Sequence, residues 1–167
     1  GGGGSIPVAS GWTDDGSTVR LTTSSDDVGI GVSAPDEKLD VDGNIDINQN
    51  ALCITLTADE SIDIGEIVRV SSSTDMRVEL APSNSEQVIG VAVSSATTGN
   101  PLRIAVSGMV QVLVSENVSR GEYVRVNSTG RAGDDGTSGN ARDFGIFLEN
   151  GSNGNLVWMV FIKAEIY

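Results

Sequence analysis

The carboxylates are the chain's main candidates for chemistry. Residues 40–46 read Asp-Val-Asp-Gly-Asn-Ile-Asp and space their acidic side chains much as a calcium-binding loop does. Such a loop needs a Gly at its sixth position and a bidentate Glu at its twelfth, where this chain has Ile45 and Ala51. A strand, a turn and a second strand with solvent-facing acids explain the same pattern. We therefore predict no metal site here.

A second arrangement of acids could suit sugar hydrolysis. Glu66 and Glu122 occupy equivalent places in two similar segments, and glycosidases work with two carboxylates a few ångströms apart across a cleft. Each of these glutamates follows a Gly and precedes an apolar run, which is typical of an exposed turn. Asp134-Asp135-Gly136 likewise reads as a turn or loop tip. We interpret all of them as turn carboxylates.

The composition argues against the common catalytic and cofactor chemistries. The sequence has no His, which removes the usual general base near neutral pH and the commonest metal ligand. Its one Cys, Cys53, cannot form a disulfide within the chain, and its apolar neighbours predict a buried, inert thiol. We predict that the protein is not an enzyme and has no catalytic, cofactor-binding or metal-binding residue.

The charge restricts the partners. Asp and Glu number 23 against 10 Lys and Arg, which gives a net charge of −13. Such a field repels nucleic acid and anionic membranes, because phosphate groups bind to clustered cations. No apolar stretch is long enough to span a bilayer. We expect neither nucleic acid nor membrane as a partner.

A repeat organises the second part of the sequence. Ile-Gly-Glu-Ile-Val-Arg-Val at 64–70 returns as Arg-Gly-Glu-Tyr-Val-Arg-Val at 120–126, an offset of 56, and Val-Ile-Gly-Val at 88–91 returns as Asp-Phe-Gly-Ile at 143–146, an offset of 55. Residues 51–167 are therefore predicted to form one small all-β barrel or sandwich, built from two copies of a unit of about 55 residues with pseudo-two-fold symmetry.

Alternation predicts which side chains fill this domain. The expected core positions are Val68, Val70, Leu102, Ile104 and Val106 in the first copy and Val124, Val126, Val157, Met159 and Phe161 in the second.

The outer face of the last strand differs between the copies. The first copy has Arg103 and Ala105 there, whereas the second has Trp158 and Val160. Either that strand is central in the domain, or its outer face meets another subunit or the N-terminal segment, and we favour such an interface. Residues 128–142, which are rich in Gly, are expected to form a mobile loop.

The first 50 residues divide into a flexible arm (1–11) and an acidic, extended β-hairpin segment (12–50). Strands are predicted over 18–22, 28–31 and 38–42. The segment holds 9 acids against 2 bases and has narrow apolar faces. It cannot bury enough area to fold alone, so we expect it to pack on the second part of the chain or on other copies of itself.

Two segments of the sequence resemble known protein families. Residues 12–45 resemble the repeats of bacteriophage tail fibres through Val-Gly-Ile-Gly at 28–31, Pro35, and Glu-Lys-Leu-Asp-Val-Asp-Gly-Asn-Ile at 37–45. The departure is Val-Ser-Ala at 32–34, where Thr and Ser are usual. The resemblance implies a three-chain β structure.

Residues 57–112 resemble the β domains of phage capsid decoration (cement) proteins. The pattern consists of 64–70, then Val-Ile-Gly-Val-Ala at 88–92 and Arg-Ile-Ala-Val-Ser-Gly at 103–108. It implies a homotrimer on the virion that binds the major capsid protein and stabilises the shell. Our hypothesis is a head decoration protein. The alternatives are a tail-fibre or spike module that binds a host glycan and, more remotely, a carbohydrate-active enzyme.

Overall fold

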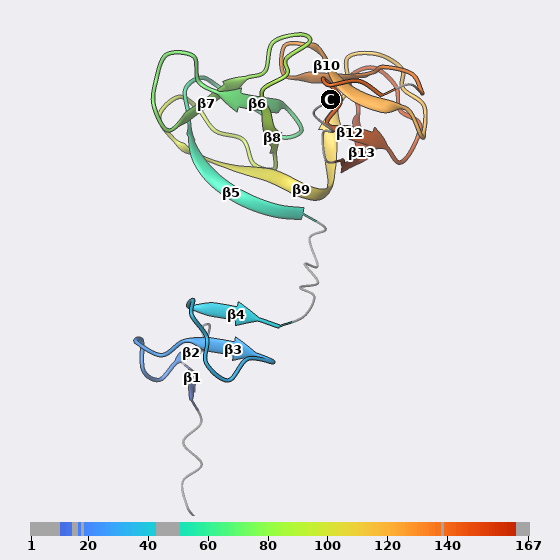
Figure 1. The fold of residues 1–167 in the computed structure, drawn as a ribbon. Helices are drawn as coiled ribbons and strands as arrows, with labels where there is room; N and C mark the ends of the chain where they lie inside the picture. Colours follow the sequence, from blue (N-terminus) through green and yellow to red (C-terminus); the bar gives the residue numbers. More distant parts are fainter. Residues whose placement is uncertain (1–10, 15–16, 18, 43–50, 138, 163–167) are drawn as a thin grey trace, which may run out of the picture. The chain divides into compact units, whose positions relative to one another are not determined.

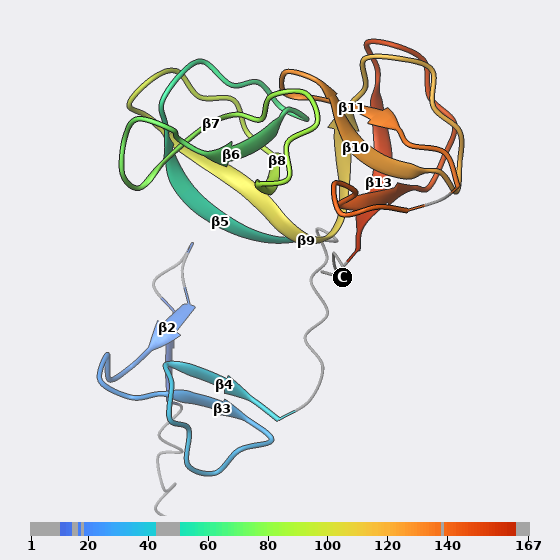
Figure 2. The same cartoon turned by 45° about the horizontal axis from the view of Figure 1, so that its top comes forward.

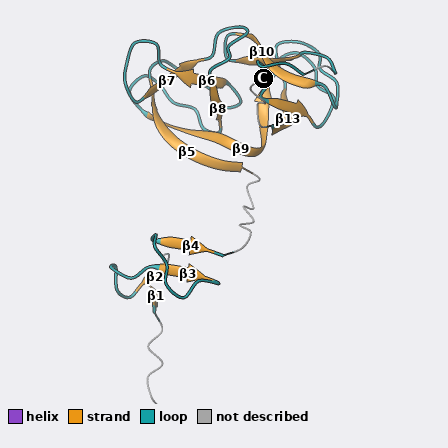
Figure 3. Ribbon diagram, viewed as in Figure 1, coloured by secondary structure: helices purple, strands orange, loops and turns teal. Residues whose placement is uncertain are grey.

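The structure is all-β, as the sequence predicts. It is a computed structural model that describes residues 11–14, 17, 19–42, 51–137 and 139–162. All regular structure in these residues is β-strand, with no helix among them (Figure 3). The described residues consequently offer no helix that could cross a membrane.

The chain divides into two compact units, Gly1–Asp46 and Ile47–Tyr167. The described residues of the first form four short strands: β1 (Trp12–Asp14), β2 (Val19–Leu21), β3 (Val28–Ile30) and β4 (Leu39–Val41). β1 and β2 pair antiparallel, whereas β3 and β4 pair parallel, which local alternation could not indicate. The predicted arm, apart from Gly11, and the turn and strand expected after Asp42 lie outside the described residues.

This first unit has little interior. None of the side chains described between residues 11 and 42 is buried. Trp12, Ile30 and Leu39 are 51%, 55% and 57% exposed. The low burial agrees with the shortage of apolar area in the sequence.

The second unit is a nine-stranded sheet that curls onto itself. Its strands are β5 (Ala51–Ala58), β6 (Ile67–Val70), β7 (Arg77–Leu80), β8 (Val88–Ala92), β9 (Pro101–Leu113), β10 (Tyr123–Ser128), β11 (Arg131–Asp134), β12 (Gly145–Phe147) and β13 (Leu156–Phe161). Their order is β11-β10-β12-β13-β9-β5-β7-β6-β8, and β8 also pairs with β9. The β8–β9 pairing closes a β-barrel of β9, β5, β7, β6 and β8.

The remaining strands form a second ring on the other half of β9. Pairing runs from β9 through β13, β12 and β10 to β11, and an isolated parallel bridge between Val114 and Ala132 joins β11 to the end of β9. Figures 1 and 2 show β9 passing from the lobe of β5–β8 to the lobe of β10–β13. The long strand thus belongs to both rings.

Matching hydrogen bonds occur in the two halves. The amide of Gly65 donates to the carbonyl of Ala92 (2.9 Å), and the amide of Gly121 donates to that of Phe147 (2.9 Å). The isolated bridge between Ile62 and Ala96 has its counterpart between Val118 and Gly151. These positions are related by the offsets of the sequence repeat. The origin of the domain in two copies stays a prediction.

Two apolar clusters fill the unit. The smaller cluster contains Ala58, Ile62, Val68, Val78, Ala92, Leu102 and Ile104, all 1% exposed or less. The larger contains the corresponding residues of the second half, Val114, Val118, Val124, Ala132, Phe147, Val157 and Met159, together with residues from both halves such as Ile67, Val91 and Val126. Most predicted core positions are therefore buried, with Val106 and Phe161 partly buried against the clusters.

Val70 is the exception, and its prediction was wrong. Its side chain is 56% exposed, whereas the matching Val126 is fully buried. β6 ends at Val70, but β10 continues to Ser128. A loop of the first half also lies along β10, because the amide of Asn84 donates to the carbonyl of Val126 (2.7 Å). Burial at these matched positions is set by a neighbouring loop and not by alternation.

The stretch 128–142 is also more ordered than predicted. It contains β11, which pairs with β10 in a hairpin that turns at Gly130 (φ 70°). A Cβ on Gly133 would lie 2.0 Å from Oε1 of Glu116 and 2.5 Å from Cβ of Asn127. The glycine therefore allows close packing here, and its presence does not mark a loop.

Substitutions at the matched strands test the two cores. Val68→Asp and Val124→Asp should each abolish cooperative unfolding, because an unpaired buried charge costs several kcal/mol, a large share of a small domain's stability. Val70→Asp is the matched control, and it should remain folded because that side chain is exposed. Thermal unfolding followed by circular dichroism distinguishes them. A Val124→Asp protein that melts like the unaltered one would contradict the assignment of this face.

Candidate functional site

The carboxylates of Glu66 and Glu122 each stabilise a turn by accepting a backbone hydrogen bond. Oε2 of Glu66 accepts a hydrogen bond from the amide of Asp63 (2.8 Å), and Oε2 of Glu122 accepts one from the amide of Ser119 (2.9 Å). Both glutamates are half-buried and not exposed as predicted. Burial raises the pKa of the Glu66 carboxyl. Each carboxylate therefore serves its own turn, which accounts for the repeated Gly-Glu pair.

The other predicted turn acids also accept local hydrogen bonds. Oδ1 of Asp134 accepts the amide of Gly136 (3.2 Å), and Asp135 pairs with Arg125 (3.3 Å). Of the 40–46 stretch the structure describes residues 40–42, which include the end of β4. No group of three or more acidic, Cys or His side chains suited to a metal ion occurs in the described part of the chain.

One buried acid gave no signal in the sequence. Asp143 is 2% exposed; its Oδ2 accepts the amide of Asn140 (2.6 Å), while its Oδ1 has no hydrogen-bond partner. Burial raises the pKa of this carboxyl. The repeat aligns Asp143 with Val88 of the first half. The aligned residue is apolar, so the repeat predicted a strand position here and not a buried acid.

An open cleft with both apolar and polar lining residues lies beside β9 and β13. Its volume is about 220 Å³. Among the residues that line it are Cys53, Ile64, Arg103, Met109, Gln111 and Trp158. Cys53 is half-buried, so the prediction of a buried thiol was wrong; its place on this lining explains the difference.

Strand register extends this cleft into a surface. Trp158 lies opposite Gln111, Val160 opposite Met109, and Leu156 opposite Leu113, while Val157 and Met159 between them point into the core. We call this outer side of β9 and β13, with the neighbouring Ile64, the β9–β13 face.

The β9–β13 face remains partly open to solvent. Ile64, Leu156 and Met109 are 50%, 39% and 36% exposed, and Trp158 and Val160 are half-buried. The last strand is thus fully buried on one side and half-buried on the other. The apolar side chains on its outer side are available to another protein surface.

The comparison with protein families agrees with this architecture. Residues 45–162 match the model of the phage cement protein family, which covers both rings. The chain belongs to the phage cement protein family. This confirms the predicted resemblance and places the protein among the structural proteins of the phage virion, at the capsid surface. Residues 12–44, which carry nearly all of the tail-fibre resemblance, precede the matched range, and that resemblance stays a prediction.

The fold has a counterpart among solved structures. The cement protein resembles the head fiber gp8.5 N base of bacteriophage phi29, with a TM-score of 0.57 and 19% sequence identity over 70% of this chain and 98% of the other. At this identity the likeness concerns the fold. No curated protein matches the sequence.

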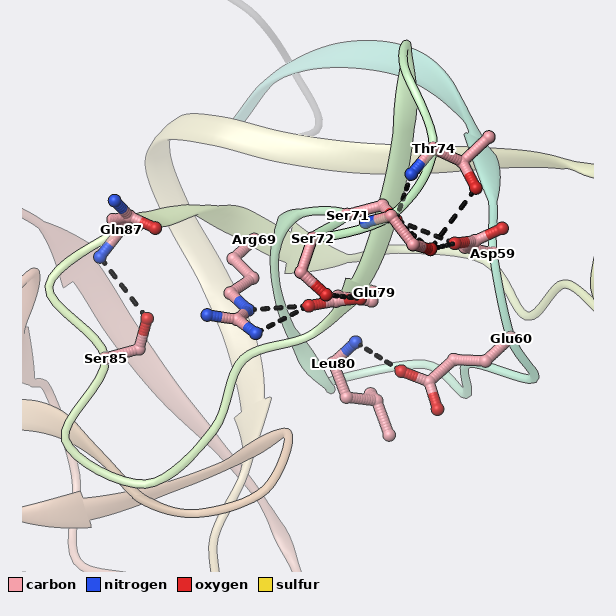
Figure 4. A network of polar contacts seen from close by, with 11 residues as sticks. Asp59, Glu60, Arg69, Ser71, Ser72, Thr74, Glu79, Leu80, Ser85 and Gln87 are labelled. Carbon is pink, nitrogen blue, oxygen red and sulfur yellow. Dashed lines mark hydrogen bonds and ion pairs between the residues drawn. The ribbon is translucent and has the colours of Figure 1, made fainter.

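A polar network holds the turn between β6 and β7 of this cement protein (Figure 4). Oδ2 of Asp59 accepts hydrogen bonds from the hydroxyls of Ser71 (2.7 Å) and Ser73 (3.1 Å), and Oδ1 pairs with Arg77 (3.2 Å). The Ser71 hydroxyl in turn accepts the amide of Thr74 (3.1 Å). The hydrogen bond from Ser71 lowers the pKa of the Asp59 carboxyl.

A second ion pair lies beside this turn. Glu79 accepts from Nε of Arg69 (2.9 Å) and from the hydroxyl of Ser72 (3.1 Å). Arg69 thus lies on the outer side of its strand, as alternation predicts, but it is tied to its neighbour across the hairpin. The turn is held from both sides by carboxylates.

The pKa of Asp59 predicts a pH dependence. Because its folded-state pKa is lowered, its contribution to stability is present above the unfolded-state pKa and is lost as the pH falls through the folded-state value. Asp59→Asn should therefore lower the melting temperature at pH 7. The difference from the unaltered protein should begin to shrink near pH 4, the usual pKa of an unfolded-state Asp, and should be lost once the pH falls below the lowered folded-state pKa. Calorimetry across this range measures it.

Glu66→Gln is the control of opposite sign. Burial raises the pKa of Glu66, so the unaltered protein gains stability as the pH falls through that raised value. The substitution should cost little at pH 7 and relatively more in acid. Parallel curves for Asp59→Asn and the unaltered protein would show that the Asp59 charge does not stabilise the turn.

Proposed function

We propose that this cement protein stabilises the phage head as a trimer bound to the major capsid protein. Membership of the cement family supports the capsid as the partner. The β9–β13 face is the observation that supports association of chains, because it leaves Trp158 and its apolar neighbours partly exposed. The role is structural rather than catalytic, since the candidate catalytic acids described above serve turns.

The closed sheet decides how chains could associate. Open sheets pair through the backbone groups of their edge strands, and a barrel removes such edges. Here β8 returns to β9, and β11 is bridged to Val114. Association through the second unit must then depend on side-chain faces, and the β9–β13 face supplies an apolar one.

The first unit supports the same proposal. Its strands leave Trp12, Ile30 and Leu39 more than half exposed. Three copies of this segment could cover one another's apolar side chains, as the resemblance to tail-fibre repeats implies. In a closed ring of three chains, each copy would use the same pair of surfaces.

Trimer formation can be tested directly. Light scattering of the unaltered protein at micromolar concentration should give the mass of three chains. Trp158→Ser should weaken the trimer by about 2 kcal/mol or more, since buried Trp side chains dominate interface energies. Val70→Ser, at an exposed valine outside this face, should leave the mass unchanged. A monomer at this concentration would contradict self-association through the face.

Capsid binding needs a separate experiment. The unaltered protein should co-sediment with shells of the encoding phage that lack the cement protein, and should raise the temperature at which those shells release their contents. Binding of a ligand to the intact state stabilises that state by mass action, so saturation of the shell should maximise the shift. Co-sedimentation with isolated tails instead of shells would favour the tail-fibre alternative.

A further inference from the structure

Met76 has an unusual combination of exposure and backbone conformation. It lies in the turn between β6 and β7 and is 77% exposed. Its φ is 58°, in the left-handed region that residues with a side chain rarely adopt. The turn thus presents a large apolar side chain to solvent at a position that favours Gly.

The second half shows what this position requires. Val70 pairs with Val78 in the first hairpin, and Val126 pairs with Ala132 in the second. Met76 and Gly130 each stand two residues before the second member of these pairs, and Gly130 has a φ of 70°. A positive φ is thus adopted by Gly130 in one hairpin and by Met76 in the other. The fold itself gives no reason for the methionine.

The polar network holds Met76 in place. Asp59 binds Ser71, Ser73 and Arg77 on both sides of the methionine, and the amide of Ser71 donates to the carbonyl of Arg77 (2.8 Å) to close the turn. A side chain on a turn that is already ordered loses less conformational entropy on binding than one on a mobile loop. Strained residues held by their surroundings are concentrated at functional sites.

The charge around the methionine indicates the chemistry of its partner. Asp75 next to it is exposed, and Arg77 is neutralised by Asp59. With a net charge of −13 on the whole chain, a partner surface with Lys or Arg at its rim would be attracted. Met is adaptable in shape and suits an apolar pocket on a protein.

We propose that Met76 is the anchor by which the cement protein engages the capsid, inserting into an apolar socket of the major capsid protein that is rimmed by basic side chains. The inference rests on the proposed function and names the contacting element. It separates two surfaces: the β9–β13 face joins copies of this chain, and the β6–β7 turn contacts the shell.

Met76→Gly tests the proposal without straining the fold. Gly adopts this φ without penalty, so the melting temperature should stay within about 3 °C of the unaltered protein. Binding to shells of the encoding phage that lack the cement protein should weaken about 30-fold, the effect of losing an interface anchor. Met76→Gln keeps the side-chain length and the backbone strain, and it should weaken binding to a similar extent because the apolar contact is lost.

Asn84→Gly is the matched control. Asn84 is exposed and has the same φ of 58°, but it presents no apolar side chain. Its replacement should leave shell binding unchanged. If the unaltered protein binds shells and both Met76 variants bind them within threefold of it, the anchor is wrong and the cement function stands. If the unaltered protein does not bind shells, both the Met76 anchor and the proposed cement function are wrong.

Discussion

The second unit depends on a single strand that serves two rings. β9 pairs with β5 and β8 along its first half and with β13 along its second. The exchange occurs at Gly108, which pairs with Ala51, while the next residue, Met109, pairs with Val160. Gly108 has a φ of 92°, which a residue with a side chain would resist. The strand can therefore change partners without ending.

This shared strand explains how a chain with modest apolar content builds a core. Each ring encloses a small cluster of matching residues, and residues of both halves join the larger cluster between them. Neither half must bury its surface alone, because the outer side of one ring packs against the other. Ala105, on the outside of the first ring, is fully buried for this reason.

The acidity of the protein has a structural side. Several carboxylates accept backbone amides at turns or pair with Arg across a hairpin, as Glu66, Glu122 and Glu79 do. Such acceptors order the turns without a helix or a disulfide. They leave the outer sides of the strands to differ between the halves: Trp158 stands where the first half has Arg103.

The amino-acid sequence by itself determined the all-β class, the repeat, most of the core and the family. These follow from local patterns, because alternation marks one face of a strand and a repeated Gly-Glu pair marks a recurring turn. The two sides of β13 were also predictable, since Trp158 and Met159 are neighbours in the chain and must point in opposite directions.

Only the tertiary structure decided how matched positions came to differ. Val70 and Val126 are equivalent in sequence, but a distant loop lies along the strand of Val126 alone. The parallel pairing of β3 with β4, the strand β11 in a Gly-rich stretch and the left-handed conformation of Met76 likewise depend on pairing and contacts that alternation does not record. Alternation along a strand shows which face a side chain lies on. Its burial and its backbone conformation are set by the segments that fold against it.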